Sequence, residues 1–291
     1  MIAAKIKHFL QHCFRRKFSF VQERMSPEGV FGLHFTIGAA IIAGAAWLFG
    51  GIAEDLITGD PLVQVDGLVS EWFRLHATPC FTVGMHIASA LASTTAVGTL
   101  SALMGCVLLW KRLWYWLLGM VLAVAGGMLL NVVLKDLFGR ARPGWADPSM
   151  ALADPGFPSG RTMMATIVYG FITINLMARI GPWPVRFSMA IATIALVLLV
   201  ALSRMYLGEH YLSDVLGAMA AGMAWLALYT VFLLGLKRSA PGYIEQVWNL
   251  EALSGVQIYG LPLEELLFGF SFGLVWSGIY EHFTWKRCVV E

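Results

Sequence analysis

Six apolar segments, each suited in length to crossing a bilayer, constrain the fold of this chain more than any other feature. The hydrocarbon core of a bilayer is spanned by about 20 residues of helix. Of the 291 residues, 58% are hydrophobic and only 13% are charged, whereas soluble domains carry about 25% charged residues. We therefore predict an all-α, polytopic membrane protein. The expected spans are Leu33–Ala53, Phe81–Trp110, Leu113–Leu134, Thr162–Ile180, Phe187–Leu202 and Tyr211–Leu236.

The sequence divides into three parts around these spans. Residues 1–32 are rich in Lys and Arg and too polar for a cleaved signal peptide, so we expect a basic helix on the cytoplasmic membrane surface. Residues 33–238 form the six-span core, with an interfacial helix at Val65–His76 after a turn-rich segment. Residues 239–291 are a C-terminal extension, predicted to contain an interfacial helix and a seventh apolar helix that starts near Pro262.

Basic residues on the loops predict the orientation of the chain. The positive-inside rule places the amino terminus and one set of loops in the cytoplasm. Three other polar segments then fall together on the extracytoplasmic face: Lys135–Pro143, Phe157–Thr162 and Ser203–Asp214. The Lys and Arg residues of these segments lie on the face where the positive-inside rule expects few of them. We therefore expect these cations to have a chemical role. The cytoplasmic set is Lys111, Arg112, Arg179, Arg186, Lys237 and Arg238.

The third polar segment contains a histidine and a carboxylate at a spacing typical of catalysis. His210 and Asp214 are four residues apart and share one face if the segment is helical. A carboxylate there holds an imidazole in one tautomer and stabilises its charged form, as a nucleophilic or basic histidine requires. The same pair also has the spacing of half a metal site, but a cluster of nearby cations disfavours a bound metal ion.

Five cations in the three segments predict an anion site, most simply for phosphate. Arginine binds phosphate oxygens in pairs, and cations neutralise the charge that shifts in phosphoryl transfer. The backbone amides of Ser159 and Gly160, at the start of the fourth span, are expected to add an anion site at a helix amino terminus. In this arrangement His210 attacks the phosphoryl group and water hydrolyses the phosphohistidine. The cations are Lys135, Arg140, Arg142, Arg161 and Arg204.

These residues form three motifs in order along the chain: Lys135 with Arg142-Pro143, then Pro158-Ser159-Gly160, then Ser203-Arg204 with His210 and Asp214. Together the motifs resemble the signature of the type-2 phosphatidic acid phosphatase superfamily. The resemblance extends over about residues 35–236. It implies a six-span helical core and metal-independent dephosphorylation of lipid phosphates, with no cofactor.

The resemblance also implies a role for each motif residue. His210 is implied as the nucleophile, and Asp214 as the residue that orients it. Arg140 lies outside the motif positions, and we expect it to be a second phosphate contact or a cation that faces lipid headgroups. The implied phosphate-binding residues are Lys135, Arg142, Ser159, Gly160 and Arg204.

One position departs from the family pattern. The second motif of the family ends in a histidine that donates a proton to the leaving group, and here that position is Arg161. Arginine stays protonated, so it binds an anion but does not act as an acid. A phosphate leaving from a diphosphate needs this proton less than an alkoxide does, so Arg161 favours a lipid diphosphate. His76, His86 and Glu209 are alternative acids that the sequence leaves open.

Other classes of function are weighed against this one. An impaired lipid-phosphate binder or transporter is motivated by Arg161, although the chain has no internal repeat of the kind found in many transporters. Nucleic acid is not expected as a partner. The four cysteines have no metal or disulfide spacing and are interpreted as structural. The segment from Tyr259 is similar to a fragment of the small-subunit type of lycopene cyclase, which implies isoprenoid lipids.

The sequence thus predicts a lipid phosphatase of a bacterial inner membrane, with its site on the extracytoplasmic face. The expected substrates are isoprenyl diphosphates, including undecaprenyl diphosphate. Phosphatidate and phosphatidylglycerol phosphate come next. We expect no cofactor and no metal ion, and the sequence does not indicate an oligomeric state.

Overall fold

The structure is a computed structural model that describes residues 33–59, 61–143, 145, 154–239, 257–258 and 261–262. The basic amino-terminal segment predicted at residues 1–32 lies outside this range. So does most of the C-terminal extension, including the stretch predicted as its interfacial helix. The chain separates into two compact units, residues 1–239 and residues 240–291, which are described one at a time.

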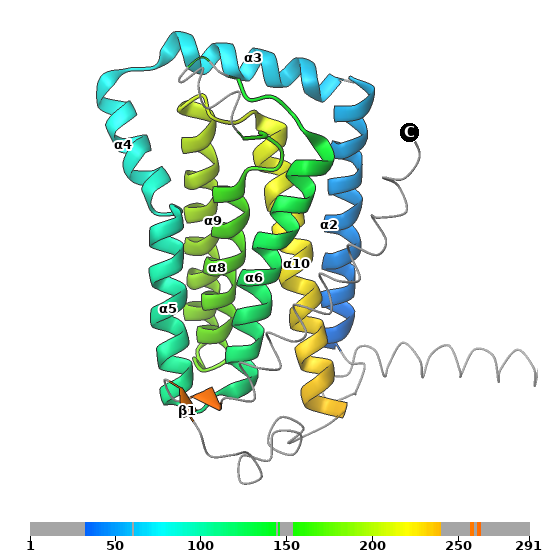
Figure 1. The fold of residues 1–291 in the computed structure, drawn as a ribbon, viewed down its shortest axis with the longest axis vertical. Helices are drawn as coiled ribbons and strands as arrows, with labels where there is room; N and C mark the ends of the chain where they lie inside the picture. The colour runs from blue at the N-terminus through cyan, green and yellow to red at the C-terminus, as the bar shows by residue number, and fades with distance from the viewer. Residues whose placement is uncertain are drawn as a thin grey trace, which may run out of the picture. The chain divides into compact units, whose positions relative to one another are not determined.

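The first unit is a bundle of long helices (Figure 1). Five of its segments are long and apolar enough to cross a membrane by length and composition: Thr36–Thr58, Pro79–Trp110, Trp114–Phe138, Trp183–Tyr206 and Leu212–Phe232. The prediction of an all-α, polytopic membrane protein is confirmed. The helices are α2 (Leu33–Thr58), α3 (Pro61–His76), α4 (Pro79–Ala90), α5 (Thr94–Trp110), α6 (Trp114–Phe138), α8 (Gly160–Met177), α9 (Trp183–Tyr206) and α10 (Leu212–Ser239).

Helix α8, which contains most of the predicted fourth span, is not one of these five segments. It packs against α5, α6, α9 and α10 and lies in the middle of the bundle (Figure 1). Ala165, Ile167 and Phe171 on this helix are inaccessible to solvent. A Cβ atom on Gly127 of α6 would lie 2.4 Å from the Ile167 side chain, so the two helices approach closely. Because protein surrounds α8, the helix can carry polar residues such as Asn175, which is 1% exposed.

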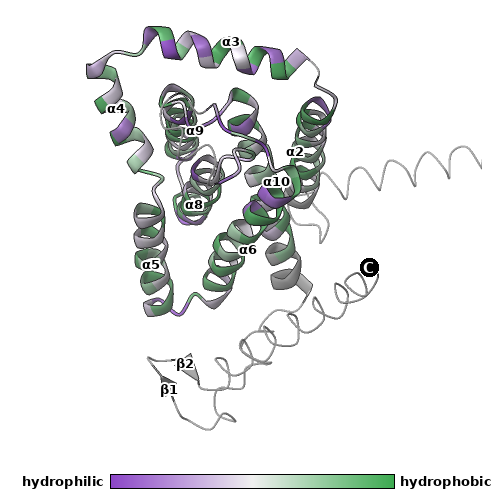
Figure 2. Cartoon of the chain, turned by 45° about the horizontal axis from the view of Figure 1, so that its top comes forward, coloured by the Kyte–Doolittle hydropathy of each residue, from purple (hydrophilic) through white to green (hydrophobic). Residues whose placement is uncertain are grey.

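The outer surface of the bundle is apolar, as contact with lipid requires. Figure 2 shows helices that are mostly hydrophobic along their length. Large apolar side chains such as Leu129 and Ile194 point outward and are 64% and 55% exposed. On a soluble monomer, a large exposed apolar surface would mark a binding site. Here the apolar surface suits the hydrocarbon core of a bilayer.

The predicted second span is two helices, not one. Helix α4 ends at Ala90, and α5 begins at Thr94 with its own cap, in which the Ser93 hydroxyl accepts a hydrogen bond from the Ala96 N–H at 3.2 Å. A capping serine satisfies one of the free amides at a helix start and so favours a break at this point. Helix α4 leans away from the direction of α5 (Figure 1).

Helix α3 lies across one end of the bundle and corresponds to the predicted interfacial helix (Figure 1). It packs against α2, α9 and α10 and alternates between hydrophilic and hydrophobic residues (Figure 2). Leu68 and Leu75 are exposed on it, whereas Asp66 is buried. The segment before it is more helical than predicted, because α2 continues past Glu54 to Thr58 and α3 begins at a proline, which suits a first helical position.

Helix ends bring the predicted polar residues to this same end of the bundle. Helix α6 runs to Phe138 and is ended by Gly139, whose left-handed φ of 54° allows its N–H to donate to the Lys135 carbonyl. Lys135 therefore lies in the last turn of a helix rather than in a loop. Arg204 likewise lies in the last turn of α9, which extends to Tyr206.

In the second unit the structure describes two short strands, β1 (Gln257–Ile258) and β2 (Leu261–Pro262), which pair antiparallel. The prediction that Pro262 begins a helix is therefore wrong, because Pro262 pairs with Gln257. Only two residues separate the strands in the sequence, which is a common length for a hairpin connection. The remainder of the predicted seventh helix lies outside the described residues.

Candidate active site

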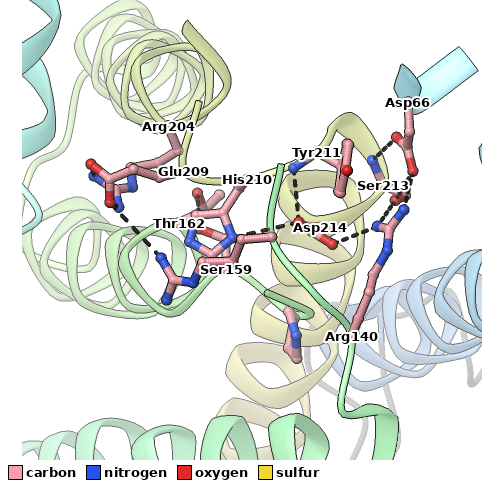
Figure 3. Close-up of polar contacts among 12 residues, drawn as sticks. Asp66, Arg140, Ser159, Thr162, Arg204, Glu209, His210, Tyr211, Ser213 and Asp214 are labelled. Carbon is pink, nitrogen blue, oxygen red and sulfur yellow. Dashed lines mark hydrogen bonds and ion pairs between the residues drawn. The ribbon is translucent and has the colours of Figure 1, made fainter. Parts of the chain in front are cut away.

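The three polar segments meet at the end of the bundle that α3 crosses. Figure 3 shows their side chains together, from the loop after α6, the first turn of α8, the last turn of α9 and the start of α10. His210 is at the centre of this group. It is 3% exposed, although it is a polar residue, so its surroundings determine its charge.

His210 and Asp214 form the predicted pair. Nδ1 of His210 lies 3.5 Å from Oδ2 of Asp214, at the outer limit of a hydrogen bond, and has no closer partner. The local structure differs from the prediction, because His210 precedes α10 instead of lying on it. Asp214 is in the first turn of α10 and also accepts a hydrogen bond from the Tyr211 N–H at 2.8 Å. The Tyr211 N–H thus helps to fix the carboxylate that faces the imidazole.

His210 is neutral at physiological pH. Burial lowers the pKa of His210 to about 4; the Asp214 carboxylate opposes this shift, and the charges of Arg204 and Arg142 add to it. A neutral imidazole has one free lone pair, as a nucleophile needs. With Nδ1 toward Asp214, that lone pair belongs to Nε2.

Arg140, expected as a second phosphate contact or a cation that faces lipid headgroups, lies behind Asp214 and not with the other cations (Figure 3). Its Nη1 donates to Oδ1 of Asp214 at 2.6 Å, and its Nη2 donates to Oδ2 of Asp66 at 2.6 Å. Its guanidinium also stacks on the Tyr211 ring, 4.5 Å from the centroid. Burial lowers the pKa of Arg140, but the two carboxylates raise it further, so the net shift is upward. Arg140 is therefore a fixed cation bound between two acids.

Asp66 is a site residue that the sequence did not indicate. It is 1% exposed, and it accepts hydrogen bonds from the Ser213 N–H at 2.8 Å and the Ser213 hydroxyl at 2.5 Å. With Arg140 and Asp214 it forms a buried cluster in which two carboxylates share one cation. This cluster has a net charge of −1 and lies on the Nδ1 side of His210.

Three predicted phosphate ligands are paired with two carboxylates. Lys135 and Arg142 both contact the Asp154 carboxylate, and Arg142 Nε also donates to the Asp154 carbonyl at 2.9 Å. Arg204 is bound to Glu209 by both of its terminal nitrogens, with Nη1 at 2.8 Å from Oε1. Arg142 Nη1 also lies 3.9 Å from Oε2 of Glu209. The carboxylates occupy donors that a phosphate would use.

Arg161 joins this group through Ser89, a buried residue of α4. The Ser89 hydroxyl accepts from Arg161 Nη1 at 2.6 Å and from Arg204 Nη1 at 2.6 Å. Among the described residues, Arg161 has no carboxylate within ion-pair distance. His76 and His86, considered as alternative acids, are exposed, and His76 stacks on Trp72 instead.

The second motif is held by buried contacts. Phe157 packs between the rings of Phe49 and Phe138, at centroid distances of 5.7 and 4.8 Å. The Ser159 N–H donates to the Asp214 backbone carbonyl at 3.1 Å. It is therefore not free to bind an anion, which differs from the prediction for this amide. Gly160 opens α8, and the first amides of a helix have no partner within it. The amide contribution to an anion site therefore falls to Gly160 and the residues that follow.

The groups in front of His210 carry an excess of positive charge that an anion could balance. Four cations (Lys135, Arg142, Arg161 and Arg204) face two carboxylates (Asp154 and Glu209), an excess of two positive charges. A phosphate dianion would balance that excess. The arrangement of a neutral histidine, a buried acid behind it and excess cations in front suits transfer of a phosphoryl group to the imidazole.

Comparisons with known proteins find related sequences and a related fold. The family model described as PAP2 superfamily matches residues 116–238. Phosphatidylglycerophosphatase B of Bacillus subtilis (strain 168) is 35% identical over 131 residues, which span 44% of this chain and only 63% of that relative. The crystal structure titled as the first transmembrane PAP2 type phosphatidylglycerolphosphate phosphatase from Bacillus subtilis is 26% identical, with a TM-score of 0.56, covering 67% of this chain and 94% of that chain.

Fold and site together define an integral membrane protein with a histidine–aspartate pair beside a cation cluster. The resemblance that the three motifs predicted is confirmed, because the PAP2 superfamily model matches residues 116–238 and the similar proteins are PAP2 type phosphatases.

Proposed function

We propose that this protein hydrolyses a lipid phosphate through a phosphohistidine at His210, without a metal ion. One observation carries the proposal: the buried, neutral imidazole has Asp214 at Nδ1 and arginines close enough to lower its pKa. Nε2 is then the attacking nitrogen, and Asp214 stabilises the positive charge that the ring gains as the N–P bond forms. The family relationship supports the same chemistry.

The cation cluster supplies the electrostatic part of catalysis. Lys135, Arg142 and Arg204 would exchange their carboxylate partners for phosphoryl oxygens when the substrate binds. Charge-assisted bonds from arginine to phosphate are short and strong, and they act most strongly where water is excluded. Arg142 and Arg204 are 10% and 3% exposed in their side chains, so most of their solvation is already lost before the substrate arrives.

The substrate we favour is an isoprenyl diphosphate, such as undecaprenyl diphosphate. Arg161 adds a cation with no carboxylate partner among the described residues, which suits a second phosphate group. It also adds no proton donor. A leaving phosphate tolerates that loss because it departs as a stable anion, whereas the alkoxide from a monophosphate requires a proton.

Two other readings have support. The names of the Bacillus subtilis relatives favour phosphatidylglycerol phosphate, and phosphatidate is chemically similar. The arginine at position 161 also favours a lipid-phosphate binder or transporter that keeps the pocket and turns over slowly. For location, we propose a bacterial inner membrane, which the Bacillus subtilis relatives support. The distribution of basic loops supports a site on the extracytoplasmic face.

Phosphate release by the detergent-purified protein, with EDTA present, tests these alternatives. The substrates are a prenyl diphosphate, phosphatidylglycerol phosphate and phosphatidate. The variants are His210→Ala and Arg161→His, with His86→Ala as a matched histidine control on the exposed surface of α4.

The proposal expects release from the prenyl diphosphate, loss with His210→Ala and no effect of His86→Ala. Faster release from either monophosphate would overturn the substrate assignment. If only Arg161→His is active, the protein is a binder that has lost its acid. If EDTA abolishes activity, the metal-free mechanism is wrong.

A further inference from the structure

The second step of the proposed reaction needs a base. Water attacks the phosphohistidine, and catalysis requires a group that takes a proton from this water. Arg161 cannot, because a guanidinium stays protonated. Asp214 lies at Nδ1 of His210, where the Tyr211 N–H and Arg140 already hold it. Neither residue can therefore serve the water on the phosphoryl side.

Glu209 is a carboxylate on that side. Its Oε1 accepts from Arg204 Nη1 at 2.8 Å, and its Oε2 lies 3.9 Å from Arg142 Nη1. Two cations hold a carboxyl group in the ionised form, which is the form a base needs. In Figure 3, Glu209 and Asp214 lie on opposite sides of His210.

The turn that carries Glu209 is firmly held. The N–H groups of Glu209 and His210 both donate to the Arg204 carbonyl, at 3.1 and 3.3 Å. Gly208, with a φ of 67°, precedes them and lies against the Trp145 ring, where a Cβ atom would approach to 2.5 Å. Acid and imidazole are thus neighbours on one fixed turn.

Asp154 is the other carboxylate on the same cations, and it suits the task less well. Its side chain is 51% exposed, whereas that of Glu209 is 17% exposed. Burial raises the pKa of Asp154, but its contacts with Lys135 and Arg142 lower it further, so the net shift is downward. Both carboxylates are paired with cations, but Asp154 is the more exposed and does not neighbour His210 in the chain, which makes it a matched control.

We propose that Glu209 is the catalytic base that activates water for hydrolysis of the phosphohistidine. The proposal rests on the proposed function above. In the first step Nε2 of His210 bonds to the terminal phosphorus, and the P–O bond breaks with its electron pair on the departing lipid monophosphate. In the second step water bonds to phosphorus, its proton passes to a Glu209 oxygen, and the N–P electron pair returns to Nε2. Glu209 then releases the proton to solvent.

Rapid-quench kinetics with a prenyl diphosphate labelled in its terminal phosphate separates the two steps. With Glu209→Gln we expect a normal burst of lipid monophosphate, a steady-state rate about 100-fold lower, and build-up of an acid-labile phosphoenzyme. The burst amplitude counts the folded, active sites, so a folding defect is recognised directly. Glu209→Asp keeps a carboxylate and should recover part of the steady-state rate.

Asp154→Asn removes the comparable carboxylate from Lys135 and Arg142. It should change substrate affinity without accumulating the phosphoenzyme. The proposal is overturned if Glu209→Gln turns over without extra phosphoenzyme. It is also overturned if Asp154→Asn accumulates as much phosphoenzyme as Glu209→Gln does. Absence of a phosphoenzyme in every variant, together with full activity of His210→Ala, would instead overturn the proposed function. The two failures are therefore distinguishable.

Discussion

Replacement of Asp66 by asparagine tests whether α3 holds the acid that faces His210. Asp66 is almost fully buried and binds Arg140 and both polar groups of Ser213. Asparagine has nearly the same shape but lacks the charge, and its NH2 group is only a donor. Both carboxylate oxygens of Asp66 accept hydrogen bonds, so the NH2 group of asparagine would replace one acceptor with a donor that faces other donors.

The cost follows from what Asp66 contacts. Loss of one partner from a buried ion pair costs about 3–5 kcal/mol. Arg140 keeps Asp214 as a second carboxylate, and asparagine keeps one acceptor oxygen, so we expect the lower end, about 3 kcal/mol. A change of 1 kcal/mol shifts Tm by about 2–4 °C in a domain of this size, which predicts a decrease of about 6–12 °C.

Thermal unfolding of the detergent-purified protein measures this shift. The matched control is Glu71→Gln on the same helix, which breaks the ion pair with Arg74, in which both side chains are about half exposed. Exposed pairs of this kind contribute little to stability, so the control should lower Tm much less than Asp66→Asn does. If Asp66→Asn lowers Tm no more than Glu71→Gln does, the buried cluster does not stabilise the site and the reasoning fails.

Two further predictions follow from the geometry of the site. Because burial lowers the pKa of His210 to about 4, inactivation by diethyl pyrocarbonate, which reacts with neutral imidazole, should stay nearly constant from pH 8 to about pH 5.5; a tenfold loss over that range would show an ordinary histidine. Gly217→Ala would place a Cβ atom 2.4 Å from the Phe157 ring and should lower stability by about 1–3 kcal/mol, whereas Gly98→Ala, in open space on a helix, should be neutral or stabilising; equal effects would contradict the packing.

Much of the membrane architecture could be predicted from hydropathy, because lipid leaves few alternatives for an apolar segment. Helix ends were less predictable. The predicted first and third spans end just before Glu54 and Lys135, yet both charged residues lie inside helices, at the ends where a side chain can reach water or a polar site. The break within the second span depends on one capping serine, Ser93, which hydropathy does not detect.

The motif residues could be predicted because their spacing along the chain carries the information. The contacts between segments could not. Asp66 and Arg140 are 74 positions apart, and Asp66 and Ser213 are 147 apart. In one sequence, Asp66 is simply an acid on an amphipathic helix, and Arg140 is one more cation near the phosphate motif. Only the packing of α3 across the bundle shows that Arg140 is bound between Asp66 and Asp214.

The charges around His210 explain how one substitution in the second motif changes the chemistry. The cluster at Nδ1 has a net charge of −1, which in the proposed mechanism stabilises the imidazole as it becomes positive on phosphorylation. The group on the other side has an excess of two positive charges, which balances a phosphoryl dianion. Arg161 strengthens that excess but removes a group that could carry a proton. In the proposed mechanism, proton transfer then passes to a carboxylate in the cation cluster, and Glu209 is the less exposed of the two.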